Sequence, residues 1–154
     1  MTVKSRLLEL LEQHKGETLS GEDIGRELSC TRAAVWKAVN SLRQEGYPIE
    51  AGPNKGYMLA RESNLISAEG IRLFLKDPQV EIKIFDAISS TNLEARQLAV
   101  SGIAGHGSFV VAMEQTAGRG RRGREFYSPK GSGIYLSVIL EPKGTLEGSL
   151  LITT

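Results

Sequence analysis

The chain has 154 residues, of which 40% are hydrophobic and 24% are charged, a composition typical of soluble globular proteins. Its formal net charge of +1 excludes a global field that would draw the whole protein to nucleic acid or to a membrane, so any basic function must be local. The single cysteine, Cys30, excludes an internal disulfide and favours a reducing, cytoplasmic compartment.

The N-terminal segment lacks the long apolar core and the small-residue cleavage site of a signal peptide. The longest apolar runs, FVVAM at 109–113 and IYLSVIL at 134–140, are too short to cross a bilayer as helices. We therefore expect no membrane partner.

Residues 3–60 have the pattern of a winged helix-turn-helix. Leucines at positions 7, 8, 10 and 11 form one apolar stripe of a first helix. A short second helix begins at the N-cap residue Ser20, which an acidic residue follows three positions later. A third helix follows the cap Thr31 and ends at Gly46. Residues 47–60 then indicate two short strands around the turn GPNKG, which would form the wing.

The third helix presents a polar and basic face outward, as DNA-reading helices do. On a helical wheel its apolar side chains fall on one side, and Trp36, Asn40 and Arg43 fall on another. Arginine and lysine can reach phosphates or guanine edges, and asparagine can pair with adenine. The predicted DNA-binding residues are Thr31, Arg32, Ala33, Trp36, Lys37, Asn40, Arg43 and, at the wing tip, Lys55. The alternative is that this face binds only a protein, with Trp36 as its anchor.

A polar segment after residue 62 marks the predicted domain boundary. Beyond it we expect a short helix capped by Ser67, a strand over 80–88, and a helix from Ser90 or Thr91 with Leu93, Leu98 and Val100 as candidate apolar contacts. Two further apolar strands follow a glycine-rich loop. This half is therefore a mixed α/β arrangement, and the chain as a whole is α+β.

Between these last two strands lies AGRGRRGREF, in which four arginines alternate with glycines. Glycine lets a backbone fold closely around a ligand, and arginine supplies planar donors for carboxylate or phosphate. Because a strand holds each end of the segment, the pattern favours a tethered anion cradle over a flexible nucleic-acid tag. The alternative, that this loop and the Trp36 face both bind nucleic acid, stays open.

Four motifs in order carry a resemblance to a known family: NKGYMLA at the end of the wing, SSTN after a strand, EQTAGRGRRGREFYSP, and GIYLSVILEP. Together they are similar to the bifunctional biotin protein ligases that also repress the biotin operon. The resemblance implies a winged helix-turn-helix over 1–62 and part of a class II synthetase-like ligase domain over 63–154.

The family's activity is that of a biotin–[acetyl-CoA-carboxylase] ligase. It activates biotin with ATP, which carries Mg²⁺, to biotinyl-5′-AMP, and then transfers biotin to a lysine of the biotin carboxyl carrier protein. The adenylate-bound form is a homodimer that binds operator DNA and represses transcription. These properties are what the resemblance implies for the protein to which this chain belongs.

The resemblance also assigns site residues. The implied biotin-binding residues are Ser90, Thr91, Asn92, Gln115, Gly118, Arg119, Gly120 and Arg121. The implied adenylate-binding residues are Arg121, Arg122 and Phe126, the last standing where the family often has tryptophan. Attack of a carboxylate on the α-phosphate needs no enzyme nucleophile, so Arg119 and Arg121 are the implied catalytic groups, which would neutralise phosphoryl charge. No metal ligand is expected from the protein.

The family's later Lys-Trp-Pro-Asn-Asp motif and C-terminal barrel are absent from the 154 residues. We therefore expect the chain to carry only the first half of the ligase domain and to lack part of the active site. The alternative function is a winged-helix regulator that senses a carboxylate without ligase chemistry.

Overall fold

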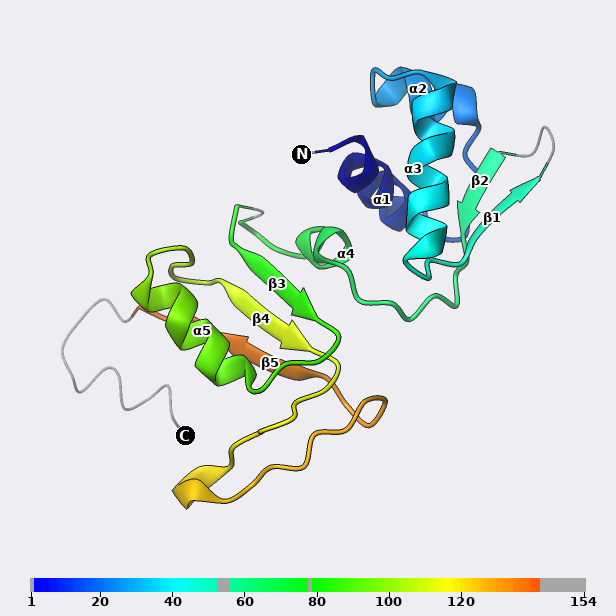
Figure 1. Ribbon diagram of the computed structural model, residues 1–154. Coiled ribbons are helices and arrows are strands. Elements are labelled where there is room, and N and C mark those ends of the chain that lie inside the picture. Colours follow the sequence, from blue (N-terminus) through cyan, green and yellow to red (C-terminus); the bar gives the residue numbers. More distant parts are fainter. Residues whose placement is uncertain (1, 53–55, 78, 142–154) are drawn as a thin grey trace. The chain divides into compact units, whose positions relative to one another are not determined.

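The computed structural model describes residues 2–52, 56–77 and 79–141 (Figure 1). The chain divides into two compact units, residues 1–78 and 79–154. No helix in the described ranges is long and apolar enough to cross a membrane.

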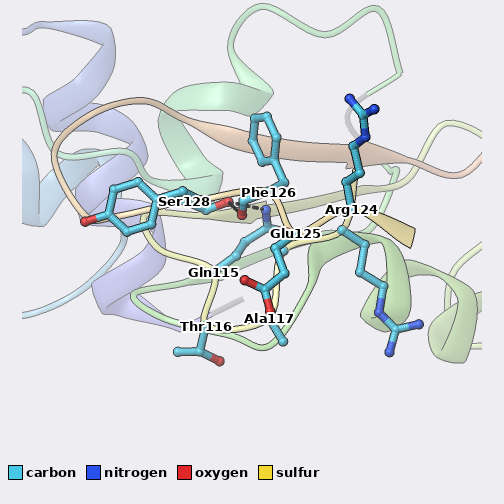
Figure 2. A pocket seen from close by; sticks show the side chains of 10 residues that line it. Gln115, Thr116, Ala117, Arg124, Glu125, Phe126 and Ser128 are labelled. Carbon is cyan, nitrogen blue, oxygen red and sulfur yellow. Dashed lines mark hydrogen bonds between the residues drawn. The ribbon is translucent and has the colours of Figure 1, made fainter. Parts of the chain in front are cut away.

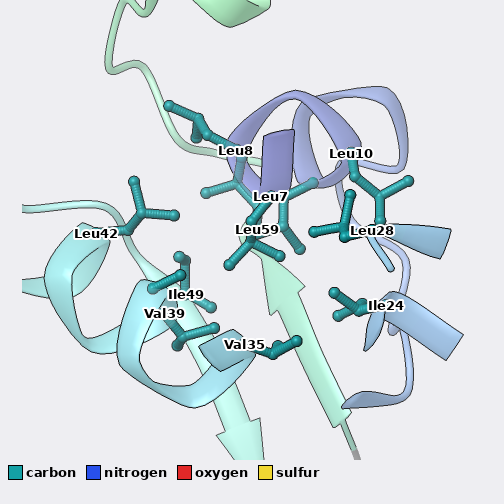
Figure 3. Packing of buried hydrophobic residues seen from close by; sticks show 12 residues of the cluster. Leu7, Leu8, Leu10, Ile24, Leu28, Val35, Val39, Leu42, Ile49 and Leu59 are labelled. Atoms are coloured by element: carbon teal, nitrogen blue, oxygen red, sulfur yellow. The ribbon is translucent and has the colours of Figure 1, made fainter. Parts of the chain in front are cut away.

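The first unit contains α1 (Val3–Gln13), α2 (Gly21–Glu27), α3 (Arg32–Gln44), β1 (Ile49–Gly52), β2 (Gly56–Leu59) and α4 (Ala68–Arg72). Its core forms where leucines of α1 meet the apolar stripe of α3 and the inward side chains of the wing (Figure 3). The buried members are Leu7, Leu8, Leu10, Leu11, Ile24, Leu28, Val35, Ala38, Val39, Leu42, Ile49 and Leu59. The predicted winged helix-turn-helix is confirmed.

Helices α2 and α3 begin at the predicted caps, and α3 ends at the predicted glycine. Ser20 Oγ accepts a hydrogen bond from the backbone N–H of Asp23 at 3.0 Å, and Thr31 Oγ1 accepts one from Ala34 at 3.2 Å. After α3, Gly46 adopts φ +94°, the left-handed conformation that ends a helix at low cost.

The wing pairs β1 with β2 antiparallel, with Ile49 opposite Leu59. Leu19 forms an isolated antiparallel β-bridge with Tyr57 of β2, in which each backbone N–H donates to the other's carbonyl oxygen, at 2.9 and 2.8 Å. Gly56 is required here, because its φ is +82° and a Cβ on it would overlap the carbonyl oxygen of Leu19.

The linker helix α4 packs on α1 within the first unit. Ser67 Oγ caps α4 by accepting from the N–H of Gly70 at 2.9 Å, and it donates to Glu12 Oε1 at 3.0 Å. Burial raises the pKa of the neighbouring Tyr47 phenol, and the carboxylates of Glu69, Glu12 and Glu45 raise it further. Because of this docking, the compact units divide at residue 78, later than the boundary expected at 62.

The second unit contains β3 (Ile82–Phe85), α5 (Thr91–Val100), β4 (Phe109–Ala112), the 3₁₀ turn η1 (Arg121–Gly123) and β5 (Tyr135–Val138). The sheet order is β3-β4-β5, with β3 and β4 parallel and β4 and β5 antiparallel. Helix α5 lies over one face of this sheet (Figure 1). The chain is thus α+β, as predicted.

Two predicted contacts of α5 are wrong. Leu93 is 43% exposed and Val100 is 83% exposed, whereas Ala95 and Leu98 are buried against Val110 of β4. Positions 91, 95 and 98 share one helical face, and positions 93 and 100 turn away from it.

Candidate functional site

The outward face of α3 and the wing together form a groove with a volume of about 330 Å³. Trp36, at 58% exposure, has no place in the core and lies on this surface. Its walls are Arg32, Trp36, Asn40 and Arg43 of α3, Ser20, Gly21 and Glu22 at the start of α2, and Ala51, Gly52, Gly56 and Tyr57 of the wing. We call this surface the α3–wing groove. The structure therefore brings four of the predicted DNA-binding residues together.

The other predicted DNA-binding residues have different settings. Thr31 uses its hydroxyl as the cap of α3. Ala33 and Lys37 are exposed but lie outside the wall of the α3–wing groove. Lys55 falls outside the described residues. Contact of each with DNA stays a prediction.

Arg43 is tied to the wing, because its Nε donates to the carbonyl oxygen of Ile49 at 2.7 Å. A guanidinium has five N–H donors, so this contact leaves others for a ligand. Arg43 therefore both holds α3 to β1 and contributes positive charge to the groove.

In the second unit the SSTN segment begins α5. Ser90 is at the N-cap position, but its side chain makes no capping hydrogen bond. The cap comes instead from Gln115, whose Oε1 accepts from the backbone N–H of Thr91 at 2.8 Å and from the Thr91 hydroxyl at 3.1 Å. The predicted pair of motifs, SSTN and Gln115, is thus joined directly.

Two serines that were not predicted extend this contact into a network. Ser137 of β5, which is buried, donates to Thr91 Oγ1 at 2.8 Å and lies 3.1 Å from Asn92 Oδ1. At the other end, Gln115 Nε2 donates to Ser128 Oγ at 3.1 Å. The sequence held one signal for Ser137: it is the only polar side chain in the middle of the apolar run IYLSVIL. We call the connected residues the Gln115 network; they are Thr91, Asn92, Gln115, Ser128 and Ser137.

The arginine loop is a closed hairpin that extends from the sheet (Figure 1). Its limbs are joined by Gln115 N–H to the Ser128 carbonyl at 2.9 Å and by Phe126 N–H to the Gly118 carbonyl at 2.9 Å. Near the tip, Gly120 N–H donates to the Arg124 carbonyl at 2.7 Å, and Arg122 adopts φ +59°. The described structure is a tethered loop, as the flanking strands predicted. We call residues 115–128 the arginine hairpin.

A cavity of about 790 Å³ lies against the arginine hairpin and is lined by residues of both limbs (Figure 2). Gln115, Gly118, Arg119 and Phe126 line it, together with Arg124, which was not among the predicted site residues. The remaining lining residues are Thr116, Ala117, Glu125, Tyr127 and Ser128.

The other predicted residues lie outside this cavity wall. Arg121 and Arg122 belong to the turn η1 at the hairpin tip, and Ser90, Thr91 and Asn92 belong to the start of α5. Thr91 connects to the cavity through Gln115. Within the described part of the chain, the four hairpin arginines make no ion pair, so their charge is available to an anion.

Gly118 and Gly120 of the hairpin differ in the space that an added Cβ would find. A Cβ on Gly118 would overlap the Phe126 carbonyl oxygen and lie 2.7 Å from Ser128 Oγ. A Cβ on Gly120 would meet only the Arg124 carbonyl oxygen, at 3.4 Å. Gly118 is therefore required for the close approach of the limbs.

Phe126, 55% exposed, makes an edge-to-face contact with Tyr135 at 6.5 Å between ring centroids.

Comparison with known proteins matches both units. Residues 3–58 match the HTH domain family, and residues 84–152 match the biotin/lipoate A/B protein ligase family. The chain is 41% identical over 154 residues to the bifunctional ligase/repressor BirA of Bacillus spizizenii, an alignment that covers 99% of the chain and 47% of that relative. The chain is thus similar to bifunctional ligase/repressors over almost its whole length.

Two further relatives agree. BirA of Escherichia coli is 38% identical over 137 residues, covering 89% of the chain and 41% of that relative. A biotin–[acetyl-CoA-carboxylase] ligase of Paracoccus denitrificans is 49% identical over 55 residues, covering 36% of the chain and 22% of that relative. The chain spans about half the length of the curated relatives it matches. In this chain the α3–wing groove lies in the HTH match and the Gln115 network lies in the ligase match.

Proposed function

We propose that this chain contributes the DNA-binding domain and the first part of the ligase domain to a biotin protein ligase that is also a transcriptional repressor. The observation that carries the proposal is the Gln115 network, which connects the SSTN segment at the start of α5 to the base of the arginine hairpin. The match to the biotin/lipoate A/B protein ligase family supports biotin as the ligand. The activity, substrates and partners below belong to the whole protein.

The reaction would join two anions, the biotin carboxylate and the triphosphate of ATP. Attack of the carboxylate on the α-phosphorus forms biotinyl-5′-AMP and releases pyrophosphate. Arg119, at the cavity wall beside Gln115, has the charge and the position to neutralise a carboxylate or phosphoryl oxygen there. Arg121 and Arg122, at the tip, would act on the adenylate if the hairpin folds over it. Mg²⁺ would arrive with ATP.

Aromatic and amide groups complete the proposed assignments. Phe126, half exposed beside the arginines, offers a ring face to the adenine. Ser90, Thr91, Asn92 and Gln115 would recognise the polar head group of biotin. The second step would transfer biotin to a lysine of the biotin carboxyl carrier protein in the cytoplasm.

The α3–wing groove would bind operator DNA, with the protein as a homodimer when it carries the adenylate. Its walls combine two arginines, an asparagine and an exposed tryptophan on one helix beside a wing, an arrangement that suits insertion of α3 in the major groove. Glu22 lies in the same groove and would disfavour non-specific approach of phosphate.

The test is calorimetry on the full-length protein with biotin, followed by detection of biotinyl-5′-AMP after addition of ATP. We expect biotin binding, adenylate formation, and weakening of both by Arg119→Ala. Binding without adenylate would support instead the carboxylate-sensing regulator. Absence of biotin binding would refute the proposal.

A further inference from the structure

We propose that Ser128 is a positioning residue that sets which way the Gln115 amide faces, and thereby the hydrogen-bonding polarity of the site at the start of α5. The proposal rests on the proposed function only for the identity of its ligand, biotin. Its basis is the hydrogen-bond geometry around the buried side chain of Ser128.

Ser128 is 2% exposed and stands at the base of the arginine hairpin. Its Oγ accepts from Gln115 Nε2 at 3.1 Å and donates to the carbonyl oxygen of Phe126 at 2.9 Å. Its own carbonyl accepts from the N–H of Gln115 at 2.9 Å. Side chain and backbone of Ser128 therefore both hold Gln115 (Figure 2).

The direction of these hydrogen bonds follows from backbone groups that can act only as a donor or only as an acceptor. The Phe126 carbonyl can only accept, so the Ser128 hydroxyl uses its single hydrogen there. Ser128 can then only accept from Gln115, which requires the amide nitrogen at that end. At the other end, the Thr91 backbone N–H can only donate, which requires the amide oxygen. Both ends give the same orientation of the amide.

The orientation of the Gln115 amide then fixes the donor and acceptor roles of the neighbouring hydroxyls. With the amide oxygen of Gln115 toward Thr91, the Thr91 hydroxyl donates to it and accepts from Ser137. The second amide hydrogen of Gln115 has no acceptor among the described residues. Gln115, which lines the hairpin cavity, therefore offers a donor to a ligand, and reversal of the amide would replace this donor with an acceptor.

The hydroxyl, rather than the volume of the side chain, is the relevant property. Ser128→Ala removes both hydrogen-bonding functions and a little volume, whereas Ser128→Cys retains volume but donates and accepts only weakly. Ser132 provides a matched control, because its hydroxyl also donates to a backbone carbonyl, that of Pro129 at 3.0 Å, but it is exposed and outside the Gln115 network.

The first experiment measures biotin affinity of the full-length variants by calorimetry. We expect Ser128→Ala and Ser128→Cys each to weaken binding about tenfold, as loss of a buried hydrogen bond does, and Ser132→Ala to leave it within about twofold. Because Ser128 acts through Gln115, adding Ser128→Ala to Gln115→Ala should change affinity no further. Wild-type affinity in Ser128→Cys, or fully multiplicative effects in the double variant, would overturn the proposal.

A second experiment needs no ligand. The side-chain amide resonances of Gln115 should be dispersed and protected from solvent exchange in the wild type and in Ser132→Ala, and should lose that protection in Ser128→Ala. Failure of the wild type to bind biotin, with this response present, would refute the biotin assignment but support the positioning role. Biotin binding with no amide response would overturn the role of Ser128 alone.

Discussion

Replacement of Gly118 by alanine should open the base of the arginine hairpin. The new Cβ would overlap the Phe126 carbonyl oxygen and lie 2.7 Å from Ser128 Oγ and 3.2 Å from Gln115 Nε2, so the two limbs must separate. Overpacking of this kind costs about 1–3 kcal/mol, and loss of the Gln115–Ser128 hydrogen bond adds about 0.5–1.5 kcal/mol. Together these costs amount to about 1.5–4.5 kcal/mol, so biotin affinity should drop roughly 10- to 2,000-fold when they fall on the ligand-binding conformation.

The matched control for this prediction is Gly133→Ala, between the arginine hairpin and β5. Its Cβ would meet no atom of the described residues within 4 Å, so affinity should change less than about threefold. The assay is titration calorimetry of both full-length variants with biotin, accompanied by thermal melting to register any global unfolding. Equal affinities for the two variants would refute the assigned role of Gly118.

Further predictions concern the charges, the groove and pH. Arg119→Ala should lower the rate of biotinyl-5′-AMP formation at least about tenfold, whereas Arg96→Ala on α5 should leave it unchanged, as a pyrophosphate-release assay would measure. Asn40→Ala should reduce specific operator binding by about 1–3 kcal/mol without changing the melting temperature, in a fluorescence-anisotropy titration at fixed salt. Because the folded-state pKa of Tyr47 is raised above its ordinary value of 10.0, its contribution to the free energy of unfolding should be present below pH 10 and be lost as pH rises above 10. Tyr47→Phe should reduce that loss, and identical urea-unfolding curves against pH for wild type and variant would contradict it.

The first unit could be predicted closely because each of its signals is local. Ser20 and Thr31 cap helices in the structure as their positions indicated, and Gly46 ends α3. Apolar periodicity then placed the inward face of α3, and the remaining polar face could only point outward. The docking of α4 on α1 could not be foreseen, because the contact between Ser67 and Glu12 joins residues far apart in the sequence.

The second unit was harder to predict for the same reason. The motif SSTN and the residue Gln115 stood out from the sequence, but their direct hydrogen bonds depend on the pairing of strands. Ser137 had one local signal, its place in an apolar run, but that signal names no partner, and Ser128 had none, because a single serine is common in loops. On α5, alanine at position 95 takes the buried place that the larger Leu93 was expected to fill, since packing depends on the face that the sheet meets.

The most direct test of the proposed function is formation of biotinyl-5′-AMP by the full-length protein. The purified protein is incubated with biotin, ATP and Mg²⁺, and the bound product is identified by mass spectrometry after denaturation. We predict one adenylate per protomer in the wild type, and strongly reduced amounts in Arg119→Ala and Gly118→Ala. Biotin binding with no adenylate would contradict the ligase chemistry, and absence of biotin binding would contradict the ligand itself.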